Sequence, residues 1–94
     1  MSIGLLRIDF RLHGCRSLKE KRQRLKGIRE RFGRAHNVAV SESGHSDVLQ
    51  RAEYVFIAVA ASPDVVERAL MDIERTVQTT VDAELIAVHR EWLD

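Results

Sequence analysis

Hydrophobic residues in this chain follow two different periods, and the order in which these periods alternate restricts the fold. Residues 3–12 alternate with a period of two, which places Leu6, Ile8, Phe10 and Leu12 on one side of a predicted strand. Further strands are predicted at residues 37–41, 54–61 and 83–92. The run 54–61 is apolar on both sides, which is typical of a central strand.

Two stretches with helical spacing separate these strands. Ser17 and Glu20 form a capping box that predicts the start of the first helix, and Gly33 marks its end. A narrow apolar stripe on this helix consists of Leu18, Leu25, Ile28 and Phe32. Ser62 and Pro63 are typical of the start of a second helix, which we expect to end near residue 79.

The predicted order is therefore strand, helix, strand, strand, helix, strand. This order predicts an α+β fold of the ferredoxin-like βαββαβ type, with a four-stranded antiparallel sheet and two helices on one face. Right-handed crossovers place the first and third strands in the centre. With 94 residues, we expect a single domain over residues 1–94.

The formal net charge of +1 conceals an uneven distribution. Residues 1–34 contain eleven Lys and Arg against three Asp and Glu, whereas residues 35–94 contain four against eleven. On the first helix, spacings of three and four residues align a basic ridge formed by Lys19, Arg22, Lys26 and Arg29. Such a ridge favours binding of an external anion, most often phosphate, although a solvated face or charge pairing with a second copy fits the same pattern.

Lys21 differs from the other basic residues because it falls inside the apolar stripe. Its side chain must either extend toward solvent or meet an anion. Together with Arg16, the Ser17 hydroxyl and the free N–H groups of the first helical turn, Lys21 would form an anion pocket. An ordinary lysine at the start of a helix fits the sequence equally well.

The face of the sheet away from the helices is the second candidate surface. If Val55, Ile57 and Val59 face the helices, this open face presents Arg7, Arg11, Tyr54 and Phe56. Aromatic residues flanked by arginine are typical of sheets that stack RNA bases. A half-apolar face on a small domain more often contacts another copy, so we expect a homodimer through this face.

The segments 4–9 and 13–22, with the run Ser-Leu-Lys-Glu-Lys-Arg at 17–22, resemble the YlxP-like family of small bacterial proteins. Segments 38–42 and 49–52 add to this resemblance, which covers nearly the whole chain. The resemblance implies a ferredoxin-like fold, an unassigned biochemical role and genes placed among those for translation factors. The positions that match are His13, Gly14, Ser17, Leu18, Lys19, Lys21, Arg22, Gln50 and Arg51.

No catalytic, metal or cofactor site is predicted. Ser43, His45 and Asp47 lie in one short segment, whereas members of a catalytic triad converge from separate elements. The four histidines have no metal-ligand spacing, and the single Cys15 cannot complete a structural zinc set. Basic residues surround Cys15, as is typical of a reactive thiol, but a passive turn residue is the simpler interpretation.

We expect a cytoplasmic protein that does not interact with membranes. The chain has no apolar run of the length that a membrane span needs, and one cysteine suits a reducing compartment. The function expected from these features is a non-enzymatic accessory factor that binds RNA or the ribosome through the basic helix. The alternatives are a self-associating interaction module and a sensor of small anionic ligands.

Overall fold

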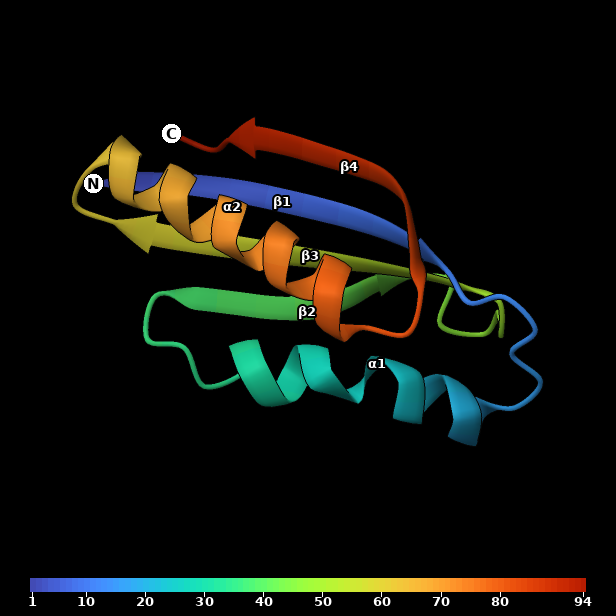
Figure 1. The fold of residues 1–94 in the computed structure, drawn as a ribbon. Helices are drawn as coiled ribbons and strands as arrows, with labels where there is room; N and C mark the ends of the chain where they lie inside the picture. Colours follow the sequence, from blue (N-terminus) through green and yellow to red (C-terminus); the bar gives the residue numbers. More distant parts are fainter.

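The computed structural model describes all 94 residues and contains one four-stranded antiparallel sheet with two helices (Figure 1). The elements are β1 (Ser2–Arg11), α1 (Leu18–Phe32), β2 (Val38–Gly44), β3 (Arg51–Ala60), α2 (Pro63–Thr80) and β4 (Glu84–Trp92). The strand order is β2-β3-β1-β4, so β1 and β3 are central. The predicted α+β ferredoxin-like βαββαβ fold is confirmed. Neither helix is long and apolar enough to cross a membrane.

The hydrophobic core lies between the sheet and the helices. On β1 the core side chains are Leu6, Ile8 and Phe10, as the alternating pattern predicts, and all three are fully buried. The antiparallel register places Phe56 opposite Leu6 and Tyr54 opposite Ile8. Because residues directly opposite each other share a face of the sheet, both aromatic rings belong to the core face.

The predicted exposure of Tyr54 and Phe56 on the open face is therefore wrong. Tyr54 is 5% exposed and Phe56 is fully buried, whereas Val55 and Ile57 point to the open face. Both sides of β3 are apolar, so the period of two does not distinguish them. The volume of the aromatic rings distinguishes the two sides. Phe56 packs edge-on against Phe32 of α1, with 5.6 Å between ring centroids, and fills the space between sheet and helix.

The two helices cover the sheet unequally. Figure 1 shows α2 running across β1 and β3, whereas α1 lies along β2. On α1 the buried face consists of Lys21, Leu25, Ile28 and Phe32. Leu25, Ile28 and Phe32 of the predicted stripe are buried, whereas Leu18 is 45% exposed and Lys21 occupies the core-facing position of the first turn.

The β2–β3 hairpin is longer than the sequence pattern predicts. Strand β2 extends to Gly44, and β3 begins at Arg51 rather than at Tyr54. The pairing register shifts between Glu42 and Gly44, which indicates a β-bulge. The polar residues at 43–44 therefore belong to the strand, and the connection between the strands covers residues 45–50.

Candidate functional site

A cleft of about 490 Å³ separates α1 from β2 and β3. Its helical wall carries three residues of the predicted basic ridge, Arg22, Lys26 and Arg29. Its sheet wall carries Glu42 of β2 and Tyr54 of β3. The cleft exists because α1 packs beside β2 instead of across the central strands.

Lys21 closes one end of this cleft from inside the protein. Its ammonium group donates hydrogen bonds of 2.8 Å to the backbone oxygens of both His45 and Val48, and it lies 3.4 Å from Oε2 of Glu42. The Lys21 side chain is only 5% exposed. Two of the three ammonium donors therefore go to backbone oxygens, and the carboxylate of Glu42 lies at ion-pair distance. The predicted role of Lys21 in an external anion pocket is therefore wrong, because this residue joins α1 to the β2–β3 connection.

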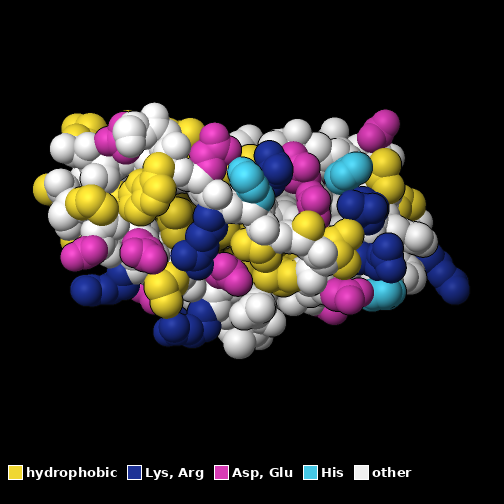
Figure 2. Space-filling view, turned by 90° about the horizontal axis from the view of Figure 1, so that it is seen from above, with side chains coloured by type: hydrophobic (Ala, Val, Ile, Leu, Met, Phe, Trp, Pro, Cys, Tyr) yellow, Lys and Arg dark blue, Asp and Glu magenta, His cyan; other side chains and the backbone are white.

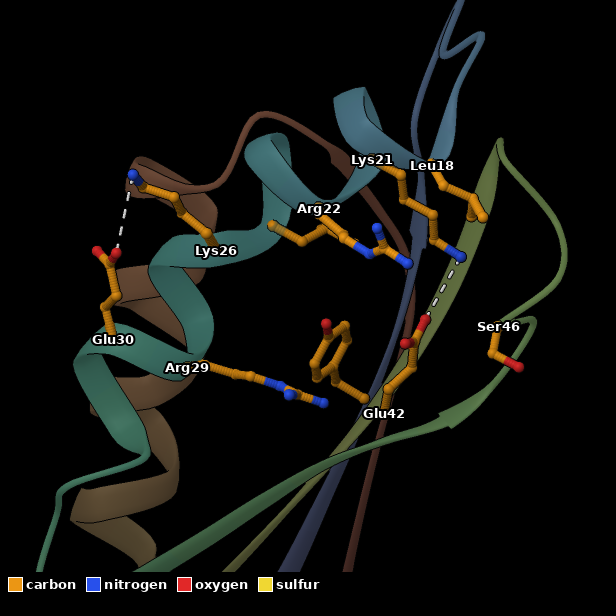
Figure 3. A pocket seen from close by; sticks show the side chains of 10 residues that line it. Leu18, Lys21, Arg22, Lys26, Arg29, Glu30, Glu42 and Ser46 are labelled. Carbon is orange, nitrogen blue, oxygen red and sulfur yellow. Dashed lines mark ion pairs between the residues drawn. The ribbon is translucent and has the colours of Figure 1, made fainter.

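Arg22 and Arg29 are the two cationic groups that the cleft leaves without protein partners. Figure 3 shows both side chains extending from α1 into the space in front of Glu42. Neither guanidinium forms a hydrogen bond or an ion pair with the protein, and both residues are exposed. In contrast, Lys26 turns away from the cleft, and its nitrogen lies 3.8 Å from the carboxylate of Glu30 (Figure 3).

Tyr54 lies at the base of the cleft with its hydroxyl in a partly apolar environment. Burial raises the pKa of Tyr54 above its ordinary value of 10.0, and the negative charge of Glu42 raises this pKa further. The positive charge of Arg29 acts in the opposite direction. The phenol therefore remains neutral around pH 7, and its hydroxyl can donate to an acceptor in the cleft.

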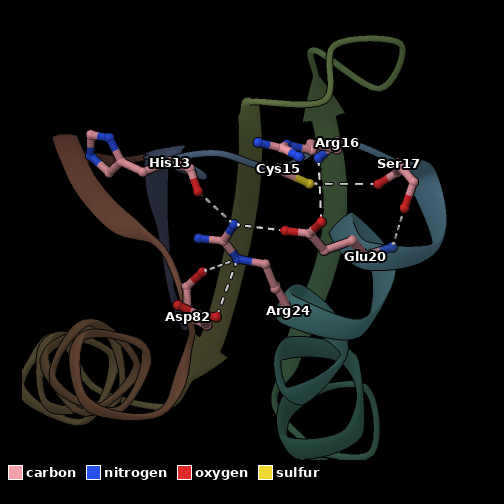
Figure 4. Close-up of polar contacts among 7 residues, drawn as sticks. All are labelled: His13, Cys15, Arg16, Ser17, Glu20, Arg24 and Asp82. Atoms are coloured by element: carbon pink, nitrogen blue, oxygen red, sulfur yellow. Dashed lines mark hydrogen bonds and ion pairs between the residues drawn. The ribbon is translucent and has the colours of Figure 1, made fainter.

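The start of α1 forms its own cap. The Ser17 hydroxyl accepts a 3.0 Å hydrogen bond from the Glu20 amide, as the sequence predicts (Figure 4). The Glu20 carboxylate lies 3.3 Å from the Arg16 amide, one residue before the position expected for a capping box. The Glu20 carboxylate therefore places a negative charge of the protein itself beside the start of α1. Arg16 and Lys19 are exposed, and their side chains form no ion pair.

Arg24 is a structural residue that the sequence did not single out. Its guanidinium donates to the backbone oxygens of Asp82 and His13 at 2.8 and 2.9 Å, and it also pairs with Glu20 (Figure 4). Arg24 therefore joins α1 to the segment before β4 and to the turn after β1. Its partners lie far away in the sequence, so they become visible only in the fold.

The remaining candidates lie on the open face or beside it. Arg7 and Arg11 are exposed on the outward side of β1, as predicted. Arg11 also borders a hollow of about 430 Å³ with His13, Gln50 and Arg51. Seen from above the molecule, basic, acidic and hydrophobic side chains are interleaved, and no large area carries one sign of charge (Figure 2).

Two chemical groups noted in the sequence have structural roles. Cys15 is 1% exposed, and its thiol contacts the backbone oxygen of Ser17, so it packs as a core residue. The hydroxyl of Ser43 contacts Glu53 at 2.8 Å and not the imidazole of His45. This arrangement does not place Ser43 as a nucleophile beside a histidine base.

The fold and the sequence together define a class of small proteins without an assigned activity. The model of the family described as protein of unknown function (DUF503) matches residues 3–90. This chain belongs to that family, as the resemblance to YlxP-like proteins predicted.

Individual relatives agree with this assignment. The chain is 31% identical over 90 residues to the uncharacterized protein YlxP of Bacillus subtilis (strain 168), and the match covers 96% of this chain and 98% of the relative. Among solved structures, a structural-genomics protein called YJCS superimposes with a TM-score of 0.61 at 9% identity. That superposition covers 99% of this chain and the whole of YJCS, and it supports the fold alone.

Proposed function

We propose that this protein is a non-enzymatic accessory factor that binds the phosphate groups of structured RNA, free or within the ribosome, in the α1–β2 cleft. The observation that carries the proposal is the pair of unpartnered guanidinium groups of Arg22 and Arg29, which extend into one cleft. Guanidinium groups bind phosphate oxygens through two parallel hydrogen bonds. We place this function in the cytoplasm, where a protein with one buried free cysteine and RNA as its partner would work.

The positions of the aromatic side chains favour binding through phosphates over binding through bases. Tyr54 and Phe56 are buried, so they cannot stack on unpaired bases. The cleft instead offers two cationic groups, and Arg16 and Lys19 extend the exposed basic surface toward the start of α1. Contacts of this kind follow the shape of an RNA backbone and depend little on its sequence.

Glu42 in the sheet wall does not exclude an anionic ligand. Its carboxylate is paired with Lys21, so the two charges largely cancel at the far end of the cleft. Arg22 and Arg29 then supply the net charge of the open part, together with the neutral hydroxyl of Tyr54.

The proposal is tested with a variant that removes the two cleft cations and with a control of equal charge. The double variant Arg22→Ser with Arg29→Ser is compared with Arg68→Ser and Arg75→Ser, two exposed arginines of α2. Binding to a labelled RNA hairpin is measured by fluorescence anisotropy at several salt concentrations. We expect the cleft variant to bind at least about tenfold more weakly and to have a smaller salt slope, since each lost phosphate contact removes about 0.9 from that slope on a duplex.

Two results would contradict this function. Equal loss in the cleft variant and the α2 variant would show that overall charge, and not the cleft, attracts the RNA. Binding that is absent from all structured RNAs and from ribosomal subunits would remove the nucleic-acid role. A melting-temperature shift with a nucleotide in that case would favour the alternative role as a sensor of small anionic ligands.

A second proposed role is self-association through the open face. The register pairs Ile3 with Val59 and Leu5 with Ile57 on this face, and Val55 extends the apolar area. We propose that a second copy covers these aliphatic side chains, because burying them removes apolar area from water. Light scattering after size exclusion measures the oligomeric state. Ile57→Lys should convert the dimer to a monomer, whereas Val65→Lys on α2 should leave the dimer intact. A native chain that is monomeric would contradict the proposed self-association.

A further inference from the structure

One imidazole and two carboxylates meet on the open face of the sheet, outside the cleft. Asp9 lies on β1, Glu53 lies on β3 and His45 begins the β2–β3 connection. One ligand atom from each of the three side chains lies within 4.8 Å of the others. These residues are far apart in the sequence, and the pairing of three strands brings them together.

The two carboxylates face each other, and neither is paired with a cationic side chain. Asp9 and Glu53 are directly opposite in the β1–β3 register, where like charges destabilise a sheet. Neither carboxylate forms an ion pair with any Lys or Arg. Arg7, Arg11 and Arg51 lie two residues away on the same face but form no ion pair with these carboxylates, so the two like charges oppose each other directly and a bound cation would stabilise them.

One oxygen of this cluster is also withdrawn from water without a hydrogen-bond donor. Asp9 Oδ1 is a buried atom with no partner in the protein, which is a costly state for a carboxylate oxygen. A ligand that accepts electron density from this oxygen would remove that cost. A hydrogen-bond donor or a metal ion would do so, whereas an anion would not, and the neighbouring imidazole and second carboxylate favour the metal ion.

The surroundings of the cluster hold two of its members in place. The hydroxyl of Ser43 lies 2.8 Å from Oε1 of Glu53, the kind of outer contact that orients a ligating carboxylate. His45 follows the β-bulge, adopts a positive φ of 61°, and its backbone oxygen accepts the hydrogen bond from Lys21. The same lysine that closes the cleft thus fixes the backbone from which the imidazole extends.

We propose that Asp9, His45 and Glu53 bind a divalent transition-metal ion, for which Zn²⁺ is the best match. One imidazole with two carboxylates suits Zn²⁺ better than Mg²⁺ or Ca²⁺, which prefer oxygen ligands alone. Ligand distances of about 2.0–2.2 Å place the donor atoms of a tetrahedral Zn²⁺ roughly 3.4 Å apart. Side-chain rotations that bring the atoms closer by at most about 1.5 Å would complete three of four positions, and water would occupy the fourth.

The test measures Zn²⁺ binding to the tag-free protein by isothermal titration calorimetry, with Co²⁺ absorbance as a report of coordination geometry. We expect one ion per chain. His45→Gly removes the imidazole while its backbone keeps a conformation that glycine adopts freely, so this variant should remain folded and lose more than about tenfold in affinity. Ser43→Ala should weaken binding by about tenfold through the orientation of Glu53.

His89→Ala is the matched control. His89 also lies on the open face and contacts Glu91 at 3.1 Å, but no third ligand joins this pair. It should therefore leave Zn²⁺ affinity unchanged. The proposal is overturned if His45→Gly binds Zn²⁺ as tightly as the native chain, if His89→Ala loses the ion, or if neither Zn²⁺ nor Co²⁺ binds. Because none of the three ligands lines the α1–β2 cleft, RNA binding to Arg22 and Arg29 can fail without affecting this site.

Discussion

The ammonium group of Lys21 and the carboxylate of Glu42 lie 3.4 Å apart, and their side chains are 5% and 22% exposed. This pair crosses from α1 to β2, two elements that otherwise share few contacts. Its position explains how a lysine can occupy the core-facing side of a helix. Two backbone oxygens and one carboxylate replace the water that the ammonium loses on folding.

Replacing Lys21 by methionine should lower the free energy of unfolding by about 2–4 kcal/mol. The apolar side chain fits the space but leaves two backbone oxygens without their donor and Glu42 without its cationic partner, and removing one partner of a buried pair is strongly destabilising. Urea unfolding followed by circular dichroism measures the change. Lys26→Met, at an exposed position of the same helix, should change the stability by no more than about 0.5 kcal/mol.

A second substitution separates charge from packing in the Lys21 prediction. In the Lys21→Met background, Glu42→Gln removes the unpaired charge and should restore about 1 kcal/mol. No restoration would show that the loss in Lys21→Met comes from the two backbone oxygens of the β2–β3 connection and not from the ion pair.

The periodicity of the sequence was sufficient for the fold because most strands and helices have one polar side. β1 shows this: alternating residues such as Leu6 and Ile8 could only face the core. β3 is different because both of its sides are apolar, and the choice depended on which side chains fill the space beneath α1. That information lies in the packing of Phe32 against Phe56 and not in the local pattern.

How well each candidate site is predicted from the sequence depends on whether its residues are aligned by local spacing or brought together only by the fold. Arg22 and Arg29 lie on one helix at a spacing of seven, so the sequence alone aligns them. The role of Lys21 depends on carbonyl groups of residues more than twenty positions away. The cluster of Asp9, His45 and Glu53 forms only through the strand register and the β-bulge. Sequence rules for metal ligands use short spacings along the chain, so they do not detect such a cluster.

Arg24→Ala should destabilise the fold by about 1.5–3 kcal/mol. The side chain of Arg24 is only 14% exposed, and its guanidinium donates hydrogen bonds to the turn after β1 at His13 and to the segment before β4 at Asp82. Hydrogen exchange should increase around His13 and Asp82, where the lost bonds end. Arg31→Ala, an exposed arginine of the same helix without an ion pair, is the control and should have little effect. Unchanged exchange at both segments would contradict the role of Arg24 as a connection.

The phenol of Tyr54 should titrate above pH 10.0, and its phenolate absorbance can be followed directly because the chain has a single tyrosine. Glu42→Gln should lower the pKa of Tyr54 because it removes a negative charge, and Arg29→Ala should raise it. Since the folded pKa lies above the unfolded one, the stabilising contribution is complete below pH 10.0 and is lost as the pH rises through the folded pKa. Tyr54→Phe should remove the part of the stability loss at alkaline pH that comes from ionisation of this phenol. A pKa of Tyr54 at or below 10.0 would contradict the prediction.

Gly4→Ala should destabilise the protein because side chains of α2 pack directly against this residue of β1. A Cβ atom at Gly4 would lie 2.7 Å from Cγ1 of Val66 and 3.0 Å from Cδ1 of Leu70, both in the buried core. Overpacking of this kind costs about 1–3 kcal/mol, which thermal and urea unfolding can measure.

Gly27→Ala should have the opposite sign and stabilise α1 by about 0.5–1 kcal/mol, because no atom lies within 4 Å of its Cβ position and alanine favours the helix. Adding Val66→Ala to Gly4→Ala should cost less than the two separate losses combined, whereas strict additivity would show that the helix and the strand do not compete for this space.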